Sequence, residues 1–115
     1  MTLNTIDRIA LALSDPIRLQ VLDLIAAGRM AECCSPSSAD APAGVCACDI
    51  QPQLSIAPTK LAYHLKILRE AGLITEMKRG RWVYYNLDLS TLTDFVGALQ
   101  SRFAPGDRPS CGGCC

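Results

Sequence analysis

The sequence predicts a mainly α-helical (α+β) domain with the plan of a winged helix-turn-helix, made of about five helices and a two-stranded wing. Three observations predict it. Two helical stretches at the start of the chain are followed by a helix, a short turn and a second helix over residues 48–72. The apolar period then changes from helical to alternating over residues 74–87, and it becomes helical again over residues 89–103.

The bulk properties describe a single small domain. A chain of 115 residues can bury a hydrophobic core that is stable without disulfide bonds. No apolar run approaches the ~18 residues of a membrane span, and no basic leader precedes the first apolar stretch. We therefore expect a cytoplasmic protein that has no membrane partner. In that reducing compartment, its seven cysteines indicate metal or redox chemistry rather than structural disulfides.

Two helices are expected before residue 29. The first covers residues 3–13 and ends near Ser14. Asp15 is then a good N-cap, and Pro16 suits the first position of a second helix that Gly28 can end. Both helices carry an apolar stripe at helical spacing: Leu3, Ile6, Ile9, Ala10 and Leu13 in the first, and Ile17, Val21, Leu24 and Ile25 in the second.

Two segments lack any periodicity, and both carry cysteines. Residues 29–43 are rich in Ser, Pro, Ala and Asp, which predicts a flexible loop bearing Cys33 and Cys34. Residues 104–115, "APGDRPSCGGCC", predict a disordered tail. The expected organisation is therefore one folded domain over residues 1–103 and a tail over 104–115 that carries Cys111, Cys114 and Cys115.

The centre of the chain gives the helix-turn-helix. A short third helix is expected to begin around Cys48 and Asp49, and Pro52 limits how it continues. A fourth helix has Ala57 as a weak cap and ends at Gly72. The apolar face of this helix is formed by Leu61, Leu65 and Leu68. After it, two strands around a turn at Gly80 are predicted by the alternating residues Ile74, Glu76, Val83, Tyr85 and Leu87. A last helix is predicted by the helical spacing of Leu89, Leu92, Phe95, Val96 and Leu99.

Basic residues are concentrated in this region. Residues 60–81 hold six of the eleven Lys and Arg against two acidic residues, although a solvated face explains charge alone as well. The order of elements favours a DNA-binding function, because a recognition helix needs polar groups on its early exposed positions and a wing needs cations near phosphates. The predicted contacts are Thr59, Lys60, Tyr63, His64 and Lys66 on the helix, and Lys78, Arg79 and Arg81 on the hairpin.

Four segments together resemble the ArsR/SmtB family of metal-responsive repressors over residues 5–100. They are "LSDPIRLQVLDLI", "CACDI", "TKLAYHLKILREAGLI" and "KRGRWVYYNL". The resemblance implies a homodimer, built from the first and last helices, that binds two-fold symmetric operator DNA. This sequence departs from the family at Ala57 and Ala62, where many relatives have serines, so the resemblance does not imply which bases are read. His64, the only histidine, is assigned to a phosphate or base contact rather than to a metal.

Cys46 and Cys48 lie just before and within the first turn of the third helix, where the helix dipole favours a thiolate. Thiolates select soft ions. The resemblance implies that such a Cys-x-Cys segment is the inducer site of relatives that sense As(III), Sb(III), Cd(II) or Pb(II). A buried core pair is the less favoured alternative. Gln51 stands where many arsenic-responsive relatives have a third cysteine, so the third thiol is expected from elsewhere.

Two segments offer that thiol. Cys33 and Cys34 lie 12 or 13 residues before Cys46, whereas the tail cysteines lie at least 63 residues beyond Cys48. The entropy of loop closure favours the loop by only roughly 1.5 kcal/mol. We predict a metal site of Cys46, Cys48 and one of the loop cysteines, with the tail as an accessory; a contribution from the second subunit stays open. The accessory residues are Cys111, Cys114 and Cys115.

The predicted function is a transcriptional repressor that As(III) or Sb(III) releases from operator DNA. One alternative keeps the fold and senses Cd(II), Pb(II) or thiol oxidation, the last through a disulfide between the loop and the Cys46 and Cys48 pair. An enzyme is not expected. The "CGGCC" segment has the spacing of a thiol oxidoreductase motif, but no predicted strand precedes it and no predicted helix follows it.

Overall fold

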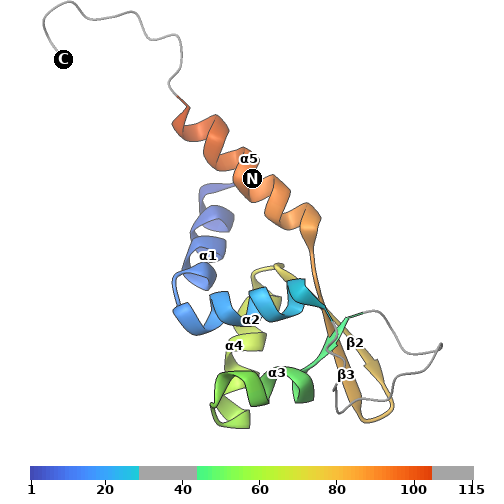
Figure 1. Ribbon diagram of the computed structural model, residues 1–115. Helices are drawn as coiled ribbons and strands as arrows, with labels where there is room; N and C mark the ends of the chain where they lie inside the picture. Colours follow the sequence, from blue (N-terminus) through green and yellow to red (C-terminus); the bar gives the residue numbers. More distant parts are fainter. Residues whose placement is uncertain (29–43, 105–115) are drawn as a thin grey trace, which may run out of the picture.

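The computed structural model describes residues 1–28 and 44–104, which form five helices and a three-stranded antiparallel sheet (Figure 1). The predicted winged helix-turn-helix is confirmed, with one strand more than expected. The helices are α1 (Leu3–Leu13), α2 (Pro16–Ala27), α3 (Ala47–Leu54), α4 (Pro58–Glu70) and α5 (Leu89–Phe103). The strands are β1 (Val45–Cys46), β2 (Ile74–Arg79) and β3 (Trp82–Leu87).

The turn between α1 and α2 follows the predicted local chemistry. Oδ1 of Asp15 accepts the N–H groups of Ile17 at 2.8 Å and Arg18 at 3.3 Å, and Pro16 opens α2. Gly28, with φ of 85°, follows the last residue of α2. Burial alone would raise the pKa of Asp15, but the two N–H groups and the positive charge of Arg18 lower it below its usual value.

Asp15→Asn is expected to lower stability at pH 7 because asparagine caps a helix equally well but lacks the charge. A carboxyl whose pKa is lower in the folded state stabilises the fold above its unfolded pKa of about 3.9, and loses that effect as the pH falls through the folded pKa. The difference between wild type and variant should therefore shrink below about pH 4. Urea midpoints at pH 7, 4 and 3 measure it, and a constant difference would contradict the role of the charge.

Helix α3 is short because of its sequence. It begins at Ala47, one residue before the predicted start, and Pro52 lies inside it. Since proline has no N–H to donate, it removes one helical hydrogen bond, and the helix ends two residues later at Leu54. Ser55 then adopts a left-handed conformation (φ of 52°), which turns the chain toward α4.

The core lies where α2, α3 and α4 meet. Leu61, Leu65 and Leu68 of α4 are buried as the apolar spacing predicts, and Leu68 is completely buried. The largest fully buried apolar side chains around them come from four other parts of the chain: Ile9, Val21, Ile50 and Leu73. The inner face of α4 is therefore fixed, and its opposite face is left to solvent.

Strand β1 was not predicted. It pairs with β3, Val45 opposite Tyr85 and Cys46 opposite Tyr84, so that β3 is central in the order β1-β3-β2. Tyr84 and Tyr85, which are neighbours on this central strand, are both buried, and the alternating residues Val83 and Leu87 are partly buried. Gly44 lies directly before β1, and a larger residue would not fit there, because its Cβ would lie 2.7 Å from the carbonyl oxygen of Tyr85.

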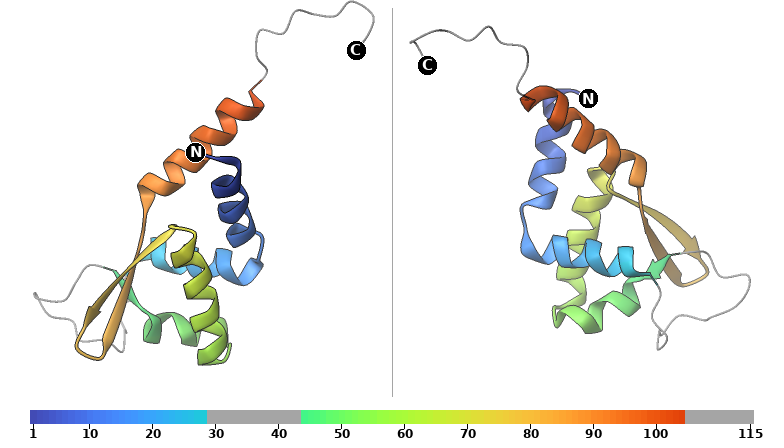
Figure 2. Two further views of the ribbon diagram at one scale, coloured as in Figure 1. Left: turned by 180° about the vertical axis from the view of Figure 1, so that it is seen from behind. Right: turned by 45° about the horizontal axis from the view of Figure 1, so that its top comes forward.

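Helices α1 and α5 lie against each other at the end of the domain away from the hairpin tip (Figures 1 and 2). Their predicted apolar stripes are only partly buried. Ile6, Ile9 and Phe95 are inside. The apolar side chains left exposed on these helices and at the N-terminus are Met1, Leu3, Leu11, Leu89, Val96 and Phe103. Within the described residues, no helix has the length and apolar character needed to span a membrane.

Candidate DNA interface and thiol site

Seven of the eight predicted DNA contacts are exposed. The N-terminal part of α4 and the tip of the β2–β3 hairpin lie at the same end of the domain, opposite α5 (Figures 1 and 2). Tyr63 is 59% exposed despite its ring. A polar helix face and a basic hairpin, which follow each other in the sequence, thus lie at the same end of the domain. The exposed residues are Thr59, Lys60, Tyr63, Lys66, Lys78, Arg79 and Arg81.

His64 corrects the sequence prediction. Its side chain is 4% exposed, and its Nδ1 lies 3.3 Å from Nη1 of Arg18. It cannot be a surface contact for DNA in this conformation. The sequence could have indicated this burial, because His64 lies three residues after Leu61 and four before Leu68, on the apolar stripe of α4.

Charge pairing distinguishes the basic residues of the hairpin. Glu76 forms ion pairs with Arg69 of α4 and with Lys78, whose Nζ lies 4.0 Å from Oε1. Arg79 and Arg81 have no ion pair with a described residue; the guanidinium of Arg81 instead lies 5.0 Å from the centre of the Trp82 ring. The tip of the hairpin therefore carries the two cations that are available to an anionic partner.

The two described cysteines meet at the start of α3. Cys46 is the last residue of β1 and the N-cap of α3, and its buried side chain is a free thiol. Cys48, half-buried in the first turn, is disulfide-bonded. Sγ of Cys48 lies 3.0 Å from Sγ of Cys46. Two thiolates that each lie about 2.3 Å from one ion are about 3.0–3.8 Å apart for bond angles of roughly 80–110°, so the spacing seen here, with Cys48 oxidised, lies at the lower end of that range.

The described residues contain no group of three metal-binding side chains. Cys33, Cys34, Cys111, Cys114 and Cys115, which the sequence offers as further ligands, lie outside the described ranges. Gln51, at the position where a third thiol is absent, donates from Nε2 to the carbonyl oxygen of Ile56 at 3.4 Å. It therefore contacts the turn between α3 and α4.

A cavity of about 480 Å³ adjoins Cys48. Its apolar wall is formed largely by α4, with Tyr85 of β3 and Gln51 of α3 on the other sides. Burial raises the pKa of Tyr85, and the negative charge of Glu76 adds to that effect. A group bound at Cys48 would consequently lie against α4, the helix with the exposed polar face. The α4 residues that line the cavity are Pro58, Leu61, Ala62, Leu65, Lys66 and Arg69.

Known proteins resemble this chain in sequence. The family described as "Helix-turn-helix domain" matches residues 13–76, more than half of the chain. "Transcriptional repressor SdpR" of Bacillus subtilis (strain 168) is 29% identical over 97 residues, which cover 84% of this chain and 91% of that protein. "Arsenical resistance operon repressor" of Staphylococcus xylosus is 30% identical over 88 residues, which cover 76% and 70%.

Solved structures share the fold. An ArsR-like transcriptional regulator from Rhodococcus sp. RHA1 superposes with a TM-score of 0.64 at 22% identity, over 86% of this chain and 79% of that one. The homodimeric winged helix-turn-helix DNA-binding domain of a possible ArsR-family regulator from Mycobacterium bovis gives 0.57 at 21% identity, over 92% and 90%. The solved structures share the winged helix-turn-helix fold, and the sequence relatives identify the chain as a DNA-binding regulator rather than an enzyme.

Proposed function

Because this chain belongs to the ArsR family of winged helix-turn-helix transcriptional repressors, we propose that it binds operator DNA in the cytoplasm as a homodimer and is released by As(III) or Sb(III). The observation that carries the inducer is the pair of sulfur atoms 3.0 Å apart at the start of α3. Once Cys48 is reduced, two neighbouring thiolates would suit a soft ion.

The exposed face of α4 is the proposed reader of the major groove. Its polar groups come from Thr59, Lys60, Tyr63 and Lys66, which can form hydrogen bonds with base edges and donate to phosphate oxygens. The cations of the hairpin are proposed to lie on the phosphate backbone beside it. They are Lys78, Arg79 and Arg81.

The proposed dimer interface consists of α1 and α5. In a single chain these helices leave large apolar side chains in water, such as Leu3 (63% exposed) and Phe103 (73% exposed). Contiguous exposed apolar surface is typical of an interface. The Mycobacterium bovis relative, which has the same fold, is described as homodimeric. A two-fold dimer places half-sites about 34–36 Å apart, or a multiple of that distance.

The proposed inducer site is Cys46, Cys48 and one of Cys33 or Cys34, once Cys48 is reduced. Cys111, Cys114 and Cys115 are proposed as accessory thiols. A third ligand drawn to the start of α3 would move or strain that helix, which packs directly on α4. Changing a DNA-competent population from 99:1 to 1:99 takes about 5.5 kcal/mol of differential binding. Structural zinc sites, worth about 10–16 kcal/mol, show that metal–thiolate bonds can supply this free energy.

The test is a titration of the reduced, full-length protein. Duplex DNA enriched by the protein from a random pool, labelled with a fluorophore, should be released as As(III) or Sb(III) is added, and fluorescence anisotropy measures the release. Cd(II) and Pb(II), added separately, test the other soft ions. An anisotropy that stays constant, or rises, with As(III) would contradict the proposed inducer without affecting the proposed DNA binding.

Thiol oxidation is a second candidate signal, and the disulfide at Cys48 favours it. Here an oxidised Cys48 would be the state with low affinity for DNA. Native mass spectrometry separates the two proposals, since As(III) adds the mass of the metal whereas mild peroxide removes two hydrogens per disulfide. Release of DNA by peroxide, with no response of the reduced protein to As(III), would favour the redox signal.

A further inference from the structure

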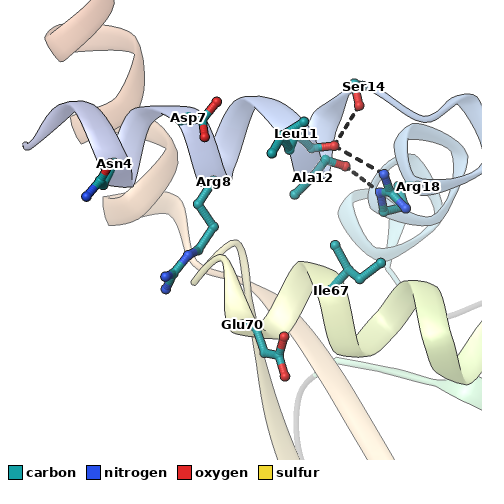
Figure 3. A pocket seen from close by; sticks show the side chains of 9 residues that line it. All are labelled: Asn4, Asp7, Arg8, Leu11, Ala12, Ser14, Arg18, Ile67 and Glu70. Atoms are coloured by element: carbon teal, nitrogen blue, oxygen red, sulfur yellow. Dashed lines mark hydrogen bonds between the residues drawn. The ribbon is translucent and has the colours of Figure 1, made fainter.

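The guanidinium of Arg18 lies at the junction of α1, α2 and α4, beside a cavity of about 770 Å³ (Figure 3). Its Nε donates to the carbonyl oxygen of Ala12 at 2.8 Å, and its Nη2 donates to that of Leu11 at 3.1 Å. These carbonyls belong to the last turn of α1, where the backbone carbonyls no longer accept a helical hydrogen bond from the N–H four residues later. The carbonyl oxygen of Leu11 also accepts from the N–H and the hydroxyl of Ser14, so Arg18 of α2 and Ser14 together hold the C-terminal end of α1.

The same guanidinium reaches α4. Its Nη1 lies 3.3 Å from Nδ1 of His64 and 3.9 Å from Oδ2 of Asp15. Arginine has no acceptor, so Nδ1 of His64 accepts this hydrogen bond and the neutral ring carries its proton on Nε2. Arg18 thus joins the end of α1 to the inner face of α4 through three separate donors.

The histidine is poorly suited to a purely structural role. Its Nε2 is buried and has no hydrogen-bond partner among residues 1–28 and 44–104. A buried donor without a partner destabilises a protein relative to an apolar side chain of similar size. The ring of His64 also packs edge-on against the exposed ring of Tyr63, with centroids 5.5 Å apart. The contact therefore extends from Arg18 to a side chain on the proposed DNA-reading face.

We propose that Arg18 and His64 are positioning residues that fix the orientation of α4 relative to α1. The inference rests on the proposed function, in which α1 belongs to the dimer interface and α4 reads DNA. In a two-fold dimer, the separation and angle of the two recognition helices set the half-site spacing that the protein accepts. The Arg18–His64 contact therefore determines specificity for half-site spacing, although neither residue touches DNA.

The experiment compares duplexes of different spacing. Wild-type protein first enriches a two-fold symmetric duplex from a random pool, and matched duplexes then carry one base pair more or one fewer between the half-sites. Wild type should bind these about tenfold or more weakly. His64→Leu should bind the enriched duplex about tenfold more weakly, and its penalty for altered spacing should fall to about twofold, because α4 can adjust its angle.

Stability measurements separate positioning from folding. His64→Leu removes the unpartnered Nε2 at nearly unchanged volume but also leaves Nη1 of Arg18 without the Nδ1 acceptor, so the two effects oppose each other and its Tm should stay close to that of wild type. Arg18→Met should lose spacing discrimination to the same extent, and the double variant should lose no more than either single variant, as expected for two residues of one contact. Leu65→Met, at a buried neighbour on α4, is the control and should keep the wild-type penalty.

Retention of the full spacing penalty by His64→Leu would overturn the inference. So would a loss of discrimination that occurs only together with a lower Tm, because that result assigns both residues to stability alone. If wild type enriches no duplex, the proposed function fails and the inference falls with it. That outcome is recognised before any variant is measured.

Discussion

Cys46→Ser is expected to abolish the release of operator DNA by As(III) and to leave DNA affinity in the absence of metal unchanged. Cys46 supplies one of the two sulfur atoms that lie 3.0 Å apart. Changes in the shell around metal ligands already reduce affinity by about 10- to 100-fold, so the loss of a ligand should raise the As(III) concentration for half-release by about 100-fold or more.

The fold should tolerate this substitution. Cys46 is the N-cap of α3 but makes no side-chain capping hydrogen bond. Serine is nearly the same size and is a preferred N-cap, so Tm should be equal or slightly higher. Met77→Leu is the matched control, because Met77 lies in the same cross-strand row as Cys46 and Tyr84 and also carries sulfur. Normal release of Cys46→Ser by As(III), in the anisotropy titration, would exclude the pair as the inducer site.

Arg79→Ala and Arg81→Ala, each alone and combined, are expected to weaken operator binding. Both residues are exposed at the hairpin and neither has an ion pair with a described residue, so their charges are available to phosphates. Each phosphate contact that is lost should reduce the slope of log K against log salt concentration by about 0.9. The double variant should therefore lose about 1.8 in slope, and about 10- to 100-fold in affinity at low salt.

Arg102→Ala is the control for net charge. Arg102 lies in the last turn of α5, at the opposite end of the domain from the hairpin tip (Figure 1). It should leave the salt slope of wild type unchanged. Anisotropy between 50 and 200 mM salt provides the measurement. An equal loss of slope in Arg102→Ala and in the wing variants would show a general effect of charge and would exclude the hairpin as a phosphate contact.

Elements with local determinants were predictable from the sequence. The Asp15-Pro16 pair starts α2, and Pro58 starts α4, because caps and first-turn prolines act within a few residues. Gly80 (φ of 59°) lies at the turn that its position between two alternating segments predicts. The family, and the thiol pair at the start of α3, could be recognised because each depends on short runs of residues. The third thiol of the proposed site stays a prediction.

The features that were missed depend on partners far away in the chain. Val45 and Cys46 are too few to show an alternating pattern, and they form a strand only because β3 offers them an open edge. His64 was assigned to DNA because its neighbours are basic, whereas the fold turns it toward Arg18.

The sequence by itself therefore determined the order of the five helices and the two hairpin strands, the family, and which residue types carry the chemistry, because capping, periodicity and turn conformation are properties of neighbouring residues. The tertiary structure alone decided which residues far apart in the sequence meet, such as β1 with β3 and Arg18 with His64. Packing α2 and α4 together places the donors of Arg18 between the end of α1 and His64. A contact between residues 46 positions apart is decided by burial and hydrogen bonding across helices.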